Sequence, residues 1–319
     1  MAATVYVSRP LPEAVMARIK SLFDAELRPS TAPLTEAEMI RSLTEFDAVL
    51  PTLRDNYSAE IFAKVAAPKA KLLANFGVGY NHIDVEAARS AGIAVSNTPG
   101  AVTDATADIA MMLILMTARR AGEGERLVRR SAWEGWHPVQ MLGTHVTGKT
   151  LGVIGLGRIG KAIAKRAHFG FGMEVVFCNR SQVAEPGVPS IQLPSPQDVV
   201  AQADITVIAV PGGAATRHLI DASVFEAFNR QGFLVNISRG DVIDEPAMVT
   251  ALETGQLAGA GLDVYEHEPV VPDALMAMEN VVLLPHLGTA TLEVRENMGH
   301  MAVDNLEAFF AGKTPPNLV

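Results

Sequence analysis

Short apolar runs alternate with amphipathic stretches along the first hundred residues of the chain. The runs are rich in β-branched residues, which predicts buried strands, and the stretches between them have apolar residues at helical spacing. This alternation predicts a parallel sheet with helices on both faces. The predicted strands are VYVSRP, AELRPS, DAVLP, KLLANFGV and IAVSNT, and the predicted helices are PEAVMARIKSLF, TEAEMIRSL, SAEIFAKVA and VEAARSAG.

A second alternation begins at Leu151, after a predicted apolar helix over residues 103–130. Another long helix is predicted over residues 292–311. Two α/β units joined by long helices predict two domains with a cleft between them, in which a small ligand can be shielded from water. The later strands are MEVVFC, ITVIAV, GFLVNIS, AGAGLDV and VVLLP, with SPQDVVAQA, DASVFEAFN and EPAMVTALETG as their helices.

Composition supports this organisation and narrows the partners. A chain of 319 residues with 49% hydrophobic and 19% charged residues suits two well-packed domains and argues against disorder. A formal charge of −9 argues against a nucleic-acid or anionic-membrane partner. An anionic substrate would therefore need a local cluster of positive groups.

Cysteine use and the N-terminal sequence favour a cytoplasmic protein. The single cysteine, Cys178, excludes an internal disulfide, and its apolar surroundings predict a buried thiol rather than a nucleophile. The N-terminus has neither the basic start nor the apolar core of a signal peptide. The most apolar segment, residues 109–118, is half the roughly 20 residues that span a bilayer. No membrane segment and no metal site are predicted.

A glycine-rich turn between a predicted strand and a predicted helix indicates a dinucleotide site. In TLGVIGLGRIG, residues 150–160, three glycines follow the spacing G-x-G-x-x-G. Gly155 would permit the tight turn, Gly157 would let the backbone approach a pyrophosphate, and Gly160 would let the helix lie close to the strand. The motif alone is weak, but the strand–turn–helix context favours a cofactor site over an ordinary turn.

The adjoining segment GTHVTGKT, residues 143–150, matches the phosphate-loop pattern G-x-x-x-x-G-K-[ST]. That loop must follow a strand and lead directly into a helix. Here the segment precedes the strand LGVIG, so we reject a nucleotide hydrolase. Lys149 is predicted to be a solvated residue before that strand.

The residues after the next predicted strand favour NADPH. NAD-selecting sites usually place an acidic residue about 20 residues beyond the glycines. No carboxylate lies between Glu174 and Glu185, whereas Arg180 can pair with a 2′-phosphate and Asn179 and Ser181 can hydrogen-bond it. The alternative is that Arg180 merely stacks beside the adenine and the enzyme accepts NADPH and NADH alike.

Three further strand ends supply an arginine, a carboxylate and a histidine. They are NISRGDVID with Arg239, LDVYEHEP with Asp263 and Glu268, and LLPHLGTAT with His286. This set suits reduction of a 2-oxo acid. The arginine binds the substrate carboxylate or polarises its carbonyl, and the histidine donates a proton as hydride arrives. A carboxylate on the other ring nitrogen orients the imidazole and favours its protonated form.

Each of these residues alone has an ordinary structural interpretation. Arg239 suits a surface loop, Glu268 an acidic turn, and His286 a satisfied histidine at a strand end. His286 is preferred because it follows an apolar strand and Pro285 and precedes Gly288. The rival histidines are His82 and His267.

Ordered motifs along the whole chain resemble those of the D-isomer-specific 2-hydroxyacid dehydrogenase family, and within it those of the glyoxylate/hydroxypyruvate reductases. The spacing from Arg239 to Glu268 to His286 also fits that family. The motifs are ANFGVGYNHID, TDATADIA, LGVIGLGRIG, TRHLI, NISRGDVID, LDVYEHEP and PHLGTAT.

The resemblance implies a flavodoxin-like substrate domain, residues 1–98 plus 289–319, around a Rossmann cofactor domain, residues 99–288. It implies a homodimer built largely on the cofactor domain. The implied reaction is NADPH-dependent reduction of glyoxylate or hydroxypyruvate to glycolate or D-glycerate. The alternatives are an NAD-dependent dehydrogenase of another substrate, such as D-3-phosphoglycerate, and an NAD(H)-sensing corepressor-like binding protein.

The resemblance also implies roles for individual residues. His286 is the acid/base, Glu268 its partner and Arg239 the substrate anchor. The backbone of Val78 and Gly79 binds the substrate carboxylate. The cofactor is bound by Thr106, Gly155, Leu156, Gly157, Arg158, Ile159, Gly160, Asn179, Arg180, Ser181, Val210, Pro211, Thr216, Ile237, Ser238, Asp263 and Gly288.

Some segments depart from the family pattern or concern substrate choice. PGGAAT, residues 211–216, replaces the commoner P-L-T-P-E-T, which predicts a more flexible loop. Residues near Leu53 and Arg54 are expected to touch the third carbon of the substrate. Leu53 favours a small substrate, whereas Arg54 suits a phosphate equally well. Residues 136–142 are expected to reach the partner subunit's site.

Overall fold

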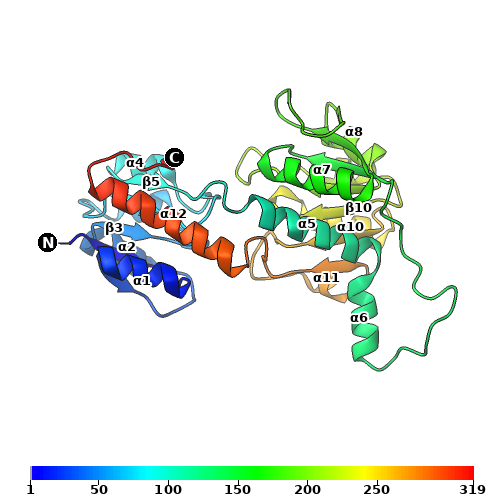
Figure 1. Cartoon of the computed structure of the whole chain (residues 1–319), viewed down its shortest axis with the longest axis horizontal. Coiled ribbons are helices and arrows are strands. Elements are labelled where there is room, and N and C mark those ends of the chain that lie inside the picture. The colour runs from blue at the N-terminus through cyan, green and yellow to red at the C-terminus, as the bar shows by residue number, and fades with distance from the viewer. Residues whose placement is uncertain (1) are drawn as a thin grey trace. The chain divides into compact units, whose positions relative to one another are not determined.

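The structure is a computed structural model that describes residues 2–319, and these form two compact units (Figure 1). The first contains the residues up to Val102 together with Thr289–Val319, and the second is Thr103–Gly288. The chain therefore leaves the first unit once and returns to it for the last helix. Among residues 2–319, no helix is both long and apolar enough to cross a membrane.

The first unit is a five-stranded parallel sheet in the order β2-β1-β3-β4-β5. The strand order reverses between β1 and β3, and the carboxyl ends on either side of such a reversal form the usual ligand site of an open α/β sheet. The strands are β1 Thr4–Val7, β2 Asp24–Leu27, β3 Ala48–Leu50, β4 Leu72–Ala74 and β5 Ala94–Ser96.

Helices pack on both faces of this sheet (Figure 1). On one face α1 and α12 lie side by side so closely that a Cβ at Gly299 would come within 2.5 Å of the Val15 side chain. The other face is an apolar core that includes Leu43, Tyr57 and Leu73. The helices are α1 Glu13–Leu22, α2 Glu36–Glu45, α3 Ala59–Ala63, α4 Val85–Ser90 and α12 Leu292–Phe310.

The second unit is a seven-stranded parallel sheet in the order β12-β11-β10-β9-β6-β7-β8. Its strand order reverses between β6 and β9, beside the glycine motif. The predicted pair of doubly wound parallel sheets is therefore confirmed. The strands are β6 Thr150–Ile154, β7 Glu174–Cys178, β8 Ile191–Gln192, β9 Ile205–Ile208, β10 Phe233–Asn236, β11 Gly259–Leu262 and β12 Val281–Leu283.

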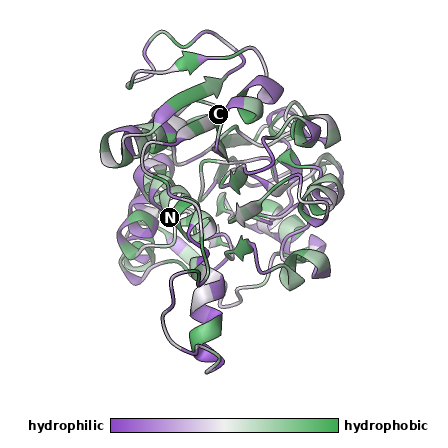
Figure 2. Ribbon diagram, turned by 90° about the vertical axis from the view of Figure 1, so that its right-hand side faces the viewer, coloured by the Kyte–Doolittle hydropathy of each residue, from purple (hydrophilic) through white to green (hydrophobic). Residues whose placement is uncertain are grey.

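Successive residues of the central strands of the second unit enter different cores. Val153 packs in the core beside α5 and α7, and Ile154 packs in the core beneath α8, α9 and α10. The ribbon shows both hydrophilic and hydrophobic residues in the helices (Figure 2). In α7 the buried residues Gly160, Ile163, Ala164 and Ala167 follow helical spacing, as in an amphipathic helix. The helices of this unit are α5 Thr103–Ala118, α6 Ala121–Arg129, α7 Arg158–Phe171, α8 Pro196–Gln202, α9 Ala222–Glu226, α10 Glu245–Glu253 and α11 Asp273–Ala277, with a 3₁₀ turn at Gly240–Val242.

The single helix predicted over residues 103–130 is wrong. It divides into α5 and α6, because Arg120 takes a left-handed conformation with φ of 53°. The carbonyl oxygen of Ala118 accepts a hydrogen bond of 2.7 Å from the N–H of Thr144 instead of continuing the helix. Strand β8 and helix α11, each short, were not predicted.

Candidate active site

The glycine motif forms the turn from β6 into α7. Gly155 has φ of +98°, and a Cβ there would lie 2.8 Å from the backbone nitrogen of Val210. A Cβ at Gly160 would lie 2.3 Å from the carbonyl oxygen of Gly155, so helix and turn are pressed together. A Cβ at Gly157 would meet no protein atom within 4 Å. Gly155 and Gly160 are thus needed for packing, whereas Gly157 faces open space.

The start of α7 presents unused hydrogen-bond donors. The first bonded N–H after the turn is that of Lys161, which donates to the carbonyl oxygen of Gly157 at 2.9 Å. Within residues 2–319, the N–H groups of Arg158, Ile159 and Gly160 bind no acceptor. Free N–H groups at a helix N-terminus fit a pyrophosphate, as does the open space above Gly157.

The residues after β7 form an exposed polar corner. The Nδ2 of Asn179 donates to the carbonyl oxygen of Ser181 at 3.3 Å, and the Nε2 of Gln192 donates to the same oxygen at 3.0 Å. Arg180 is exposed and forms no ion pair with any described residue. This corner can therefore accept an anion. The preceding Cys178 is buried, which raises the pKa of its thiol to about 11.

The rejected phosphate-loop match leads directly into β6, so no helix follows it. The Lys149 ammonium lies 3.5 Å from an Asp204 carboxylate oxygen at the start of the neighbouring strand β9. Lys149 therefore serves a surface ion pair.

Arg239 follows β10, in a turn that Asn236 holds. The buried Asn236 side chain donates to the carbonyl oxygen of Arg239 at 2.9 Å and accepts from the N–H of Ser238 at 3.0 Å. One guanidinium nitrogen of Arg239 donates to the carbonyl oxygen of Ser238 at 2.7 Å, but its buried Nε has no partner within residues 2–319. Burial lowers the pKa of Arg239 against the attraction of Glu268 and Asp241. An anion beside it would relieve this cost.

Gly240 brings the turn of Arg239 against the segment that contains Glu268. A Cβ at Gly240 would lie 1.8 Å from the carbonyl carbon of Tyr265. The N–H of Tyr265 in turn donates to a carboxylate oxygen of Glu268 at 3.2 Å. Direct backbone contact therefore sets the position of Glu268 relative to Arg239.

His286 follows β12 and pairs with Glu268. Its Nδ1 lies 3.0 and 3.1 Å from the two carboxylate oxygens of Glu268. Burial would raise the pKa of Glu268, but the hydrogen bond and charge of His286 outweigh it, and the pKa is lowered. Because Glu268 occupies Nδ1, the other ring nitrogen, Nε2, is left for a reaction partner.

Asp263 organises the turn around His286. Its backbone carbonyl accepts from the N–H of His286 at 2.9 Å, and its carboxylate accepts from the N–H groups of Leu287 and Gly288 at 2.6 and 2.8 Å. The Oγ1 of Thr106 donates to the carbonyl oxygen of Gly288 at 3.2 Å. Burial outweighs these bonds and raises the pKa of Asp263. The structure thus brings Thr106, Asp263 and Gly288 together beside His286.

The loop after β9 contains the remaining cofactor candidates of this unit. The hydroxyl of Ser238 donates to the carbonyl oxygen of Val210, which joins the ends of β9 and β10. The hydroxyl of Thr216 donates to the carbonyl oxygen of Pro211 at 2.7 Å and closes the PGGAAT loop. Ile237 is buried in the core beside α5.

The substrate candidates of the first unit lie at the carboxyl edge of its sheet. Val78 and Gly79 are half-buried in the loop after β4, and no described residue accepts from their N–H groups. Leu53 is half-buried in a turn after β3, in which the N–H of Thr52 donates to Asp55 at 2.8 Å. The adjoining Arg54 is exposed with φ of 77°.

The other histidines lack the setting of His286. His267 is exposed, and His82 lies in the first unit with Nε2 3.0 Å from the Oδ1 of Asn75. His218 does meet a carboxylate, at 2.8 Å from Glu266, but it lies in the loop before α9. No group of His, Cys, Asp and Glu within residues 2–319 has the arrangement of a metal site.

Sequence reasoning missed the buried asparagines. Asn75 directly follows the apolar strand β4, and Asn236 is the last residue of the apolar strand β10. Each side chain hydrogen-bonds the backbone of the next turn. An asparagine at the end of a buried strand is a usable signal, because its amide must find backbone partners once it is buried.

Comparison with known proteins agrees with this architecture. Residues 111–288 match the family model described as D-isomer specific 2-hydroxyacid dehydrogenase, NAD binding domain. The chain belongs to this family and is an NAD(P)-dependent oxidoreductase.

Its relatives cover the whole chain. A glyoxylate reductase of Thermococcus kodakarensis is 40% identical over 324 residues, which cover 100% of this chain and 96% of that protein. A putative D-isomer specific 2-hydroxyacid dehydrogenase of Polaromonas has a TM-score of 0.92 at 35% identity and 100% coverage of both chains. An NADPH-dependent glyoxylate/hydroxypyruvate reductase of Sinorhizobium meliloti, solved with NADP and malonate, has a TM-score of 0.87 at 34% identity, with 100% and 97% coverage.

Proposed function

We propose that the protein reduces a small 2-oxo acid, glyoxylate or hydroxypyruvate, to glycolate or D-glycerate with NADPH. The observation that carries this proposal is the contact of His286 with Glu268, at 3.0 Å, beside the half-buried Arg239. The names of the relatives, glyoxylate reductase and glyoxylate/hydroxypyruvate reductase, point to the same substrates.

In this reaction the side chains polarise the carbonyl and deliver the proton. Arg239 anchors the substrate through its guanidinium and draws electron density toward the carbonyl oxygen. When bound, the reduced nicotinamide supplies the hydride to the carbonyl carbon. His286 donates a proton from Nε2 to the oxygen, and Glu268 on Nδ1 stabilises the protonated ring and holds its orientation. The fixed position of Glu268 supports this assignment.

The cofactor would lie along the carboxyl edge of the second sheet. The N–H groups of Leu156, Gly157, Arg158 and Ile159 would hold the pyrophosphate, and Gly155 and Gly160 would shape the turn. Asn179, Arg180 and Ser181 would hold the 2′-phosphate, for which the unpaired Arg180 is the main support. The remaining cofactor contacts are proposed for Thr106, Val210, Pro211, Thr216, Ile237, Ser238, Asp263 and Gly288.

We assign the two units to the two ligands. The Rossmann unit holds the cofactor, and the flavodoxin-like unit binds the substrate carboxylate through the N–H groups of Val78 and Gly79, with Leu53 near the third carbon. The protein would work as a cytoplasmic homodimer joined through the cofactor unit. The exposed apolar side chains Trp133, Trp136, Val139 and Leu142 support an interface on that unit.

The test is a panel of 2-oxo acids assayed with NADPH and with NADH. Turnover of glyoxylate or hydroxypyruvate with a higher kcat/KM for NADPH is the expected result. A higher kcat/KM for NADH would overturn the cofactor assignment. Failure to turn over any 2-oxo acid, with cofactor binding retained, would overturn the enzymatic proposal.

A further inference from the structure

Side-chain amides fix three consecutive carbonyl groups in the loop after β4. The Nδ2 of Asn75 donates to the carbonyl oxygens of Gly77 and Gly79, at 3.1 and 3.0 Å. The Nδ2 of Asn97 donates to the intervening carbonyl oxygen of Val78 at 2.9 Å. Each of these three carbonyls therefore has a donor from within the first unit, which sets the orientation of its peptide plane.

This arrangement determines what the loop offers to a ligand. The N–H of a peptide points away from its carbonyl, so peptides whose oxygens are bound by the protein direct their N–H groups elsewhere. Within residues 2–319 the N–H groups of Val78 and Gly79 have no acceptor. They are preorganised donors for an anion.

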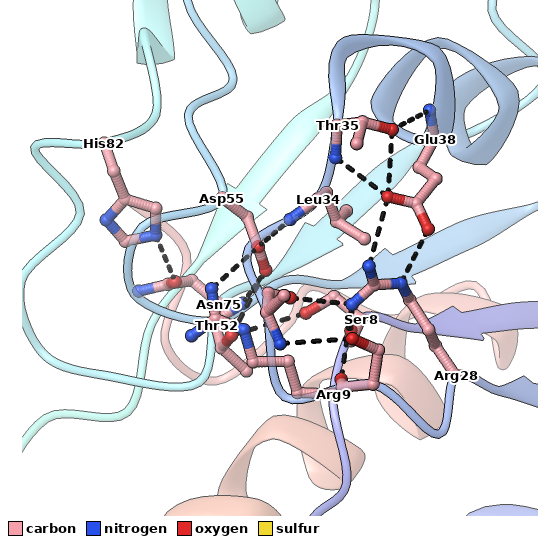
Figure 3. A network of polar contacts seen from close by, with 12 residues as sticks. Ser8, Arg9, Arg28, Leu34, Thr35, Glu38, Thr52, Asp55, Asn75 and His82 are labelled. Atoms are coloured by element: carbon pink, nitrogen blue, oxygen red, sulfur yellow. Dashed lines mark hydrogen bonds and ion pairs between the residues drawn. The ribbon is translucent and has the colours of Figure 1, made fainter.

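Asn75 itself is held in one orientation. Its side chain is completely buried, and its Oδ1 lies 3.0 Å from the Nε2 of His82 (Figure 3). Both donor contacts of Asn75 use Nδ2, so Oδ1 is the acceptor and His82 Nε2 carries the hydrogen. A flipped amide would oppose its oxygen to two carbonyl oxygens. The flip would also set the NH2 group of Asn75 against the Nε2–H of His82, so the His82 contact adds to the preference for one orientation.

We infer that Asn75, oriented by His82, is a positioning residue that sets the N–H groups of Val78 and Gly79 for the substrate carboxylate. The inference rests on the proposed function, because it takes those N–H groups as the carboxylate site. It adds that His82, which sequence reasoning treated as a rival acid/base, acts through Asn75 and transfers no proton.

The decisive variant is Asn75→Asp, which keeps the size of the side chain. It replaces the donor group by a carboxylate oxygen that faces the two carbonyl oxygens and cannot donate to them. We expect KM for glyoxylate to rise roughly 10- to 100-fold, since a displacement of about 1 Å has effects of that order. The kcat should fall less, and Kd for NADPH should not change. Asn81→Asp is the control, because it adds a carboxylate at an exposed position of the same loop.

Binding of oxamate, an unreactive carboxylate analogue, to the NADPH complex gives a readout independent of turnover. Calorimetry should show weaker oxamate binding for Asn75→Asp by the same factor as KM. An unchanged KM and oxamate Kd in a folded Asn75→Asp protein would overturn the inference. Failure of the wild-type protein to turn over any 2-oxo acid would instead count against the proposed function.

If Asn75→Asp does not fold, variants of His82 test the inference instead. His82→Gln retains an N–H donor that can reach Asn75, whereas His82→Phe removes it. We expect KM for glyoxylate to rise in His82→Phe and to return toward the wild-type value in His82→Gln. Equal KM values in all three proteins would refute the role of His82 and, with it, the positioning of Asn75.

Discussion

At the residue scale, the candidate site is a set of side chains held by backbone groups as much as by each other. Asp263 shows this most clearly, since its carboxylate accepts from two backbone N–H groups beside His286. Those bonds stabilise the left-handed conformation of His286, whose φ is 55°. The turn therefore sets the backbone position of His286, and Glu268 sets the orientation of its ring.

His286→Asn tests the proton donor without straining that turn, because asparagine tolerates the left-handed conformation well. We expect the rate of glyoxylate reduction to fall about 10²- to 10⁴-fold, the usual contribution of a general acid. NADPH binding, followed by fluorescence titration, should stay normal. The control His267→Ala should keep full activity, and loss of NADPH binding in His286→Asn would show a structural role instead.

Arg180→Asp tests the choice of cofactor. A carboxylate at this position repels a 2′-phosphate and can bind ribose hydroxyls instead. We expect the ratio of kcat/KM for NADPH to kcat/KM for NADH to fall at least roughly tenfold, as loss of one charge-assisted hydrogen bond predicts. Arg166→Ala, which removes an arginine paired with Asp104 and Asp108, is the matched control. An unchanged ratio would mean that Arg180 makes no phosphate contact.

At the scale of elements, the position of each site residue depends on the contact between the end of a strand and the turn that follows it. The closest such contact is at Gly240, where the absence of a side chain lets the backbone of Tyr265 lie against the turn. In the first unit, Thr35 and Glu38 form a capping box at the start of α2, and Arg28 binds the same Glu38 carboxylate (Figure 3). Both features can be tested by single substitutions.

Gly240→Ala should disturb both sides of its contact. A Cβ cannot be accommodated 1.8 Å from the carbonyl carbon of Tyr265, so the backbone must move. We expect a loss of stability of about 1–3 kcal/mol, as for other overpacked sites, and a lower kcat because Arg239 and Glu268 shift. Urea unfolding and steady-state kinetics measure these effects. Gly170→Ala, at an open helical position, should be as stable as the wild type or more stable.

Glu38→Gln tests the link between pH and the stability of the first unit. Hydrogen bonds from Arg28 and Thr35 lower the pKa of Glu38 from 4.5 to about 2. The lowered pKa stabilises the folded state above about pH 4.5, and this contribution is lost as the pH falls toward 2. The Tm of wild type should therefore exceed that of Glu38→Gln at pH 6, and the gap should close on acidification. A gap that is constant with pH would contradict the assignment.

At the scale of the whole molecule, the chain carries a net charge of −9 yet places unpaired cationic groups at the candidate site. Arg180 forms no ion pair among residues 2–319, and the buried Nε of Arg239 has no hydrogen-bond partner there. The segment after α6 exposes apolar side chains, among them Trp136 at 80% exposure, and these support the proposed dimer.

We predict that the protein forms a homodimer with twice the mass of the 33.9 kDa chain. Burial of the exposed side chains of Trp136 and Val139 would provide apolar contact area. The double substitution Trp136→Glu with Val139→Glu should give monomers in sedimentation velocity experiments, because charges are poorly tolerated at the centre of an interface. The single substitution Ile191→Glu, at an exposed apolar residue of β8, should leave the dimer intact. A monomeric wild type would contradict the prediction.

The sequence by itself determined the two parallel sheets, because buried parallel strands need continuous apolar runs and their helices need amphipathic ones. It also determined the glycine turn, since only glycine fits at Gly155 and Gly160. Arg239 and His286 were singled out as candidates because polar residues at the carboxyl ends of such strands stand out against the apolar runs before them.

Only the tertiary structure decided which groups satisfy one another. The break between α5 and α6 depends on Thr144, and the orientation of the Gly77–Gly79 loop depends on Asn97 as well as Asn75. Asp263 likewise binds backbone donors 24 and 25 residues away in the sequence. Periodicity and composition describe which residues are buried, but a buried amide or carboxylate takes its partner from whichever backbone the packing brings near. The hydrogen-bond partner of such a group is therefore determined only once the sheets have formed.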